Sequence, residues 1–155
     1  MEDFYTMESF YVVNEGKKTV HPHLFGDIAK NVASGFIKEY GRDKYHHVSR
    51  SQIRRLFNEV KRYDQKLEED PEKYKKYRSE INMIISKVSY NVARAIDKKS
   101  TEEEVYKKLS KFISKGLNEK MNKDEKDYHV FTMLFEAVYG FYYSETVEKG
   151  IKGDD

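Results

Sequence analysis

The chain has 155 residues and no cysteine, a length that suits one domain and a composition that excludes disulfides, thiolate metal sites and thiol nucleophiles. Its 29 basic and 27 acidic side chains leave a formal net charge of +2, so the overall charge indicates no class of partner. No uncharged apolar run approaches the roughly 20 residues of a membrane span, and the acidic start Met1-Glu2-Asp3 differs from a signal peptide. We therefore expect a cytoplasmic protein without a membrane partner.

The first 23 residues show no long periodic pattern. Two short apolar runs flank Asn14-Glu15-Gly16, which is typical of a small hairpin or a loose arm, and Pro22 closes the segment. We expect an N-terminal arm or small hairpin at residues 1–23, a helical-bundle domain at 24–150 and a disordered tail at 151–155.

From Leu24 onward, apolar side chains recur at helical spacing. A first helix is predicted over residues 24–40, because Gly41 suits its C-terminal end. Residues 42–47 then form a loop between helices. A second helix is predicted over 50–67, opened by Ser49 with Gln52 three residues later, which is the pattern of a capping box.

Three more helices follow. The third opens at Asp70-Pro71, a capping residue followed by proline, and runs to about Asp97. The fourth begins at residue 100 or 101 and ends near Gly116, and the fifth begins at Asn122. The long strand patterns of an α/β domain are missing, so the predicted fold class is all-α, a compact bundle of about five helices.

The predicted fifth helix carries YHVFTMLFEAVYGFYY at residues 128–143, a run that is apolar nearly all round. Such a helix is central in a bundle or covered by a partner. We assign its Tyr139, Tyr142 and Tyr143 to core packing, with a surface that stacks bases or anchors a protein as the alternative. His129 is expected to be a partly buried structural histidine.

The helix predicted at 50–67 lies in a basic segment, because residues 42–67 hold eight Lys or Arg and three Asp or Glu, a net charge of +5. Its cations form two stripes at helical spacing, one beside the predicted core and one opposite it. A ladder of cations along a helix can follow a phosphate backbone. The alternative is an ordinary solvated face with ion pairs to neighbouring helices. The first stripe contains Arg50, Arg54 and Lys61, and the second contains Arg55, Arg62 and Lys66.

The histidines raise two further possibilities, a ribonuclease site and a metal site. Arg42 and His47 in the stretch RDKYHH resemble the R-x4–6-H signature of HEPN ribonucleases. That resemblance implies metal-independent RNA cleavage, with His47 as acid and base and Arg42 on the phosphate. The family places this pair on a helix, whereas here it falls in a predicted loop.

A metal site is not predicted. His21, His23, His46 and His47 are ligand-like pairs, but no Asp, Glu or Cys stands at a supporting spacing. A glycine-rich phosphate loop is also missing from the sequence. We expect neither a metal nor another cofactor.

Two stretches together are similar to a known family. Ser51-Gln52-Ile53-Arg54-Arg55 opens the basic helix, and about eighty residues later comes FEAVYGFYY at 135–143. Their order and spacing resemble the small helical subunit of the type III-A CRISPR–Cas effector, the Csm complex, over roughly residues 24–148. The chain departs from that pattern at Arg50, where a hydroxyl residue is common, and at Gly140-Phe141, where a small residue and Tyr are common.

The resemblance implies a noncatalytic, RNA-binding role in antiviral defence. Several copies of the small subunit line the groove of a ribonucleoprotein and hold the guide–target RNA duplex through its backbone, while other subunits carry the catalytic activities. The implied partners are guide RNA, target RNA, the other subunits and further copies of the chain. The rival interpretations are the HEPN-like ribonuclease and a purely structural helical protein that dimerises through its last helix. Backbone contacts are expected from Arg50, Arg54, Arg55, Lys61 and Arg62, and next from Arg42, Lys44 and Lys38.

Overall fold

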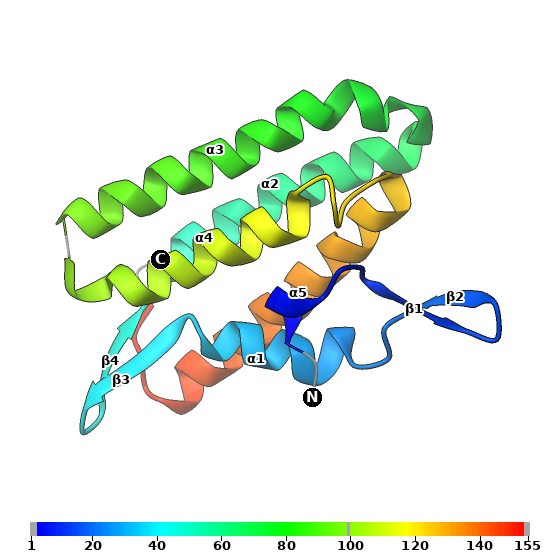
Figure 1. The fold of residues 1–155 in the computed structure, drawn as a ribbon. Coiled ribbons are helices and arrows are strands. Elements are labelled where there is room, and N and C mark those ends of the chain that lie inside the picture. Colours follow the sequence, from blue (N-terminus) through cyan, green and yellow to red (C-terminus); the bar gives the residue numbers. More distant parts are fainter. Residues whose placement is uncertain (1–2, 99, 154–155) are drawn as a thin grey trace.

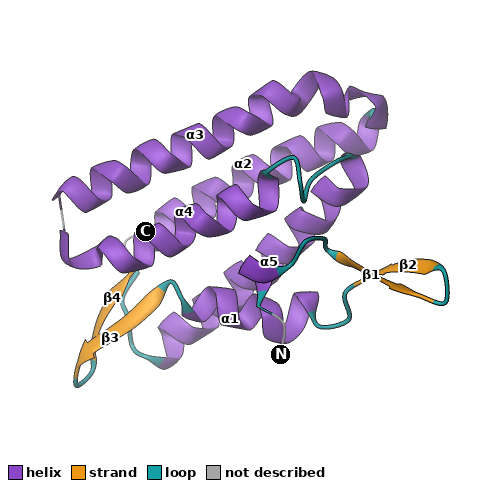
Figure 2. Cartoon of the chain, viewed as in Figure 1, coloured by secondary structure: helices purple, strands orange, loops and turns teal. Residues whose placement is uncertain are grey.

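The computed structural model describes residues 3–98 and 100–153. Within these residues the chain forms five α-helices and two short β-hairpins (Figures 1 and 2). The predicted all-α bundle of about five helices is confirmed. The helices are α1 (Ala29–Ser34), α2 (Arg50–Glu69), α3 (Tyr74–Lys98), α4 (Glu103–Leu117) and α5 (Glu125–Glu148). The hairpins pair β1 (Tyr11–Asn14) with β2 (Lys17–Val20), and β3 (Ile37–Gly41) with β4 (Lys44–His47).

The helices pack around α5. α5 contacts α1 on one side and α2 on the other, while α3 packs against α4 and α2 (Figure 1). The two hairpins project from opposite ends of the molecule in Figure 2. No helix in the described part of the chain is long and apolar enough to cross a membrane.

The predicted first helix is wrong beyond residue 34. A π-helical turn at Leu24–Ile28 continues into α1, and Gly35 ends that helix. Phe36 and Ile37 are buried, but Tyr40 is 57% exposed, so the chain leaves the core after residue 37 instead of keeping one face toward it. Residues 44–47 of the predicted loop form the strand β4, which pairs with β3 around the turn at Arg42-Asp43.

The starts of α2 and α3 follow their sequence signals. Ser49 caps α2, and its hydroxyl accepts a hydrogen bond from the backbone N–H of Gln52 at 3.4 Å. Pro71 opens a short 3-10 turn, Pro71–Lys73, that leads into α3. A similar turn, Ser100–Glu102, precedes α4. The starts of α2 and α3 are encoded locally, because capping and proline geometry depend on a few neighbouring residues.

The predicted start of α5 at Asn122 is wrong by three residues, because Asp124 is the capping residue. Asn122 is instead buried in the connection between α4 and α5. Its side-chain N–H donates to the Gly116 carbonyl at 3.0 Å, and its side-chain oxygen accepts from the Tyr74 hydroxyl at 2.8 Å. A buried amide with these partners holds the connection against α3.

Aromatic rings fill the centre of the core. The Phe112 ring lies 5.3 Å from that of Phe131 and 5.4 Å from that of Phe135, measured between centroids. On α5, Tyr142 is fully buried and Tyr139 is half-buried against Phe57, so both pack in or on the core as predicted. Tyr143 is 49% exposed, which leaves only this tyrosine of the three on the surface.

The N-terminal segment belongs to the same core. Three of its side chains, Phe4, Met7 and Phe10, are each at most 1% exposed. Phe4 packs against Phe112 of α4. At the other end, Ile151 packs against the core, whereas residues 154–155 of the predicted tail lie outside the described residues. The division into arm, helical domain and tail stays a prediction.

Candidate nucleic-acid interface

Helix α2 places four of its predicted RNA-contacting residues on the surface: Arg54, Arg55, Lys61 and Arg62 are exposed. On the core-facing side of the helix, Ile53 and Val60 are buried and anchor α2 in the core. The helical period therefore separates apolar from basic positions along the same segment, as predicted. We refer to these four exposed side chains as the α2 basic row.

Aromatic rings support part of this row. The Lys61 ammonium lies 5.9 Å from the centre of the Phe57 ring, and the Arg62 guanidinium lies 5.0 Å from that of Tyr63. Phe57 and Tyr63 are themselves buried. The cationic heads thus stay in solvent while their stems cover apolar surface.

Two of the four acids of α2 interact with neighbouring helices. Glu59 forms an ion pair with Lys87 of α3 at 3.2 Å, and Asp64 faces His129 of α5. These carboxylates are engaged by neighbouring helices. The exposed side of the first three turns of α2 is consequently basic, although the net charge of the chain is small.

Arg50 has a different environment from the rest of the predicted set. Its guanidinium donates hydrogen bonds to the Thr146 hydroxyl at 2.6 and 3.1 Å and to the Ile151 carbonyl at 2.9 Å. The same group lies 4.9 Å from the centre of the Tyr143 ring. Arg50 therefore joins the start of α2 to the end of α5.

Helix α3 supplies further cations beside α2. A hollow of about 180 Å³ between α2 and α3 is lined by Arg55, Glu59 and Lys87 and by apolar residues that include Leu56 and Val88. A neighbouring hollow of about 230 Å³ is lined by Arg94 and Lys98. Lys87, Arg94 and Lys98 lie seven and four residues apart, a helical spacing that is the signal by which they can be found.

The β3–β4 hairpin carries the remaining predicted residues. Arg42, Lys44 and Lys38 are all exposed there. Lys38 forms an ion pair with Glu104 of α4, and the hydrogen bond from Lys38 lowers the pKa of the Glu104 carboxyl. Arg42 and Lys44 stand at the turn end of the hairpin, just before the chain enters α2.

The structure does not bring the proposed ribonuclease pair together. Arg42 lies in the turn of the hairpin, and His47 lies at the opposite end of β4, paired with Ile37. The Nδ1 atom of His47 is 3.0 Å from the Val48 carbonyl. Both residues are on a hairpin and not on a helix, so the arrangement lacks the context that the HEPN signature requires.

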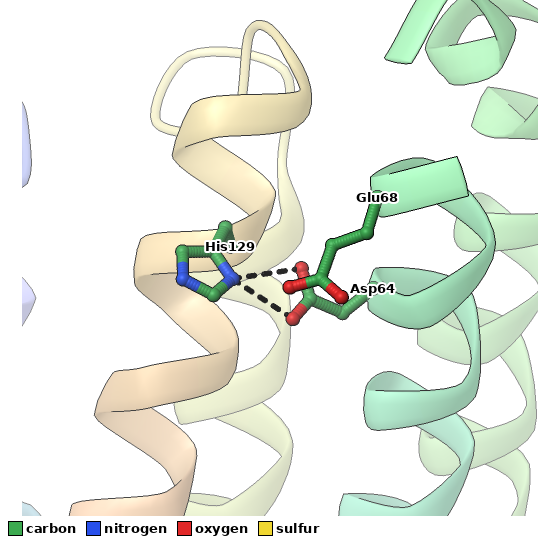
Figure 3. A group of neighbouring side chains, drawn as sticks. All are labelled: Asp64, Glu68 and His129. Carbon is green, nitrogen blue, oxygen red and sulfur yellow. Dashed lines mark hydrogen bonds and ion pairs between the residues drawn. The ribbon is translucent and has the colours of Figure 1, made fainter. Parts of the chain in front are cut away.

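One group of side chains in the described residues has the spacing of metal ligands, and it includes none of the four histidines weighed as ligands from the sequence. Asp64, Glu68 and His129 meet between α2 and α5 (Figure 3). Burial raises the pKa of the Asp64 carboxyl, and the hydrogen bond with His129 acts in the opposite direction. Sequence reasoning missed the group because Asp64 and His129 are 65 residues apart, although Asp64 and Glu68 stand at a visible four-residue spacing.

One of three comparisons with known proteins found a match. The family model described as Csm2 Type III-A matches residues 23–146, which span α1 to α4 and nearly all of α5. The curated proteins and the solved structures that were searched contain no match. Because the family match covers most of the chain and the helices on which the resemblance rests, the chain belongs to the Csm2 family of small subunits of the type III-A CRISPR–Cas effector complex.

Proposed function

We propose that this subunit holds the guide–target RNA of the Csm complex through the phosphate backbone and catalyses no reaction itself. The observation that carries the proposal is the α2 basic row, four exposed cations on one helix, while Glu59 pairs with Lys87 of α3 and Asp64 with His129 of α5. Cations along an exposed helix complement the negative charge of a phosphate backbone. The proposal also places the subunit in the cytoplasm, beside further copies of itself.

The surroundings of the basic row favour backbone contact over base recognition. The aromatic rings nearest to it, Phe57 and Tyr63, are buried beneath Lys61 and Arg62 and present no stacking platform. Contacts to phosphate and ribose position a nucleic acid without reading its sequence. A subunit of a guided complex needs no more, because base pairing reads the target.

We rank the individual candidates by their surroundings. Arg54, Arg55, Lys61 and Arg62 come first. Arg94 and Lys98 on α3 come next, followed by Arg42 and Lys44, which are exposed on the hairpin. Arg50, Lys87 and Lys38 come last, because Thr146, Glu59 and Glu104 on other helices or strands already engage them.

The test compares two triple variants in the assembled complex. Arg54→Ala, Lys61→Ala and Arg62→Ala together remove three charges from α2, and Lys75→Ala, Lys76→Ala and Lys120→Ala remove three exposed charges elsewhere. We expect the first triple to weaken RNA binding for every sequence and to reduce the log–log salt slope by about 0.7 to 0.9 per lost contact. Fluorescence anisotropy across a salt series measures both quantities.

The control triple is expected to leave affinity and slope close to those of the unmodified complex. Equal losses in the two triples would show a general charge effect and contradict contact by α2. The noncatalytic part is tested by incubating the pure chain with labelled RNA and a chelator. Cleavage that disappears in His47→Ala would overturn it and favour the ribonuclease.

A further inference from the structure

A second polar site lies where the later turns of α2 meet α5. Its members are Asp64, Glu68 and His129, which we call the α2–α5 triad (Figure 3). The Nδ1 atom of His129 is 2.9 and 3.2 Å from the two carboxylate oxygens of Asp64. One nitrogen or oxygen atom from each of the three residues lies within 4.8 Å of the others.

We propose that the α2–α5 triad binds a divalent metal ion, with Zn²⁺ as the ion that its donors fit best. One imidazole nitrogen and two carboxylate oxygens are ordinary zinc ligands at bond lengths of about 2.0–2.2 Å. Ligand atoms around such an ion are roughly 3–4 Å apart, so the observed group needs only a small contraction. Glu68 is exposed and can make that movement by rotating its side chain.

The charge balance of the site gives a second reason. Asp64 is only 7% exposed, and the side chain that faces it is His129, which carries no charge unless it is protonated. Glu68 adds another carboxylate on the same face of α2, four residues away. A buried carboxylate normally requires a charged partner or a metal, and a divalent ion supplies the two positive charges that this group lacks.

The site is also accessible. A hollow of about 400 Å³ opens over the triad and is lined by Glu125, Lys126 and Tyr11 among others. It contains one further carboxylate, Glu125, and one cation, Lys126, so its local charge remains negative. An ion can enter from solvent. Water or Glu125 can occupy the fourth coordination position, beside the three ligands of the triad.

A bound ion would join α2 to α5 and stabilise the folded chain. The inference is independent of RNA binding, because no member of the triad belongs to the α2 basic row. It also differs from the histidine pairs visible in the sequence. The rings of His21 and His23 are 5.8 Å apart next to β2, and that of His46 stacks on Tyr40.

The test uses the full chain, freed of metal by chelator and titrated with ZnCl₂ by calorimetry. We expect one ion per chain and a melting temperature that rises with zinc concentration, as linkage requires. His129→Gln and Glu68→Gln should each weaken zinc binding by at least about tenfold and remove the thermal shift. The double variant His21→Gln and His23→Gln is the matched control and should retain both.

The outcomes are distinct. Zinc binding that persists in His129→Gln and Glu68→Gln, or that is lost in the His21 and His23 control, would overturn the assignment. So would an unmodified chain that binds no zinc at micromolar concentration. Because Glu68 is exposed, Glu68→Gln keeps the fold, and a melting curve without zinc confirms that each variant is folded before titration.

Discussion

Two glycines illustrate how differently single residues are constrained in this chain. Gly116, near the end of α4, lies directly against the ring of Phe131 on α5. A Cβ atom at 116 would overlap that ring, so the close approach of the two helices depends on glycine here. Gly140 on α5 is exposed, and a Cβ atom there would meet nothing within 4 Å. The same residue type is required at one position and replaceable at the other.

We therefore expect opposite effects from two alanine substitutions. Gly116→Ala should lower the free energy of unfolding by about 1–3 kcal/mol, because Phe131 must move within a packed core. Gly140→Ala should raise it by about 0.5–1 kcal/mol, because alanine favours the helix. Urea unfolding followed by circular dichroism measures both. A neutral Gly116→Ala would show that α4 and α5 pack less closely than described.

Among the secondary-structure elements, α2 contributes both to the fold and to the proposed interface. Its buried side holds it against α5, and its exposed side carries the basic row. Arg50 and Arg54 lie one helical turn apart, yet Arg50 is bonded to Thr146 and Ile151 and Arg54 is exposed. The position of a cation along the helix is therefore not enough to assign it to RNA contact. Its hydrogen bonds to α5 must be considered as well.

This difference predicts separable effects. Arg50→Ala should lower the free energy of unfolding by about 1–2 kcal/mol, because the buried Thr146 hydroxyl loses a charged donor. Arg54→Ala should change it by less than about 0.5 kcal/mol. RNA affinity should show the reverse order, with the larger loss in Arg54→Ala. Paired unfolding and anisotropy measurements check this, and a stability loss confined to Arg54→Ala would contradict it.

Over the full length of the chain, the core extends beyond the segment that the family model matches. The match begins at residue 23, but Phe4, Met7 and Phe10 are buried in the same cluster as the helices. The N-terminal segment thus closes the core beside α4. The two hairpins, by contrast, extend outward and expose most of their residues (Figure 2).

The buried N-terminal aromatic residues should be essential for stability. Phe4→Ala and Phe10→Ala are each expected to cost about 3–5 kcal/mol, a large part of the 5–15 kcal/mol typical of a domain. The double variant should be largely unfolded, as judged by its thermal melting curve. Glu8→Ala, at an exposed position between them, is the control and should melt near the unmodified chain. A stable double variant would show that the segment is dispensable.

Much of this fold is readable from local sequence. The starts of α2 and α3 follow from Ser49 and Pro71, which act within a few residues, whereas α4 begins at Glu103, two to three residues after its predicted start. The predicted helix over 24–40 failed at residue 35. A short apolar pair such as Phe36-Ile37 fits a helix and a strand equally well, and only the path of the chain away from the core separates them.

The candidate site was likewise predictable only in part. The exposed basic row of α2 was predictable, because one helical period separates its apolar and charged positions. The engagement of Arg50 by Thr146, the pairing of Glu59 with Lys87 and the meeting of Asp64 with His129 were not predictable. Each of these contacts joins residues of different helices, between 28 and 96 positions apart. Periodicity states which side of a helix is buried, but the neighbour that covers each side depends on how the helices pack in three dimensions.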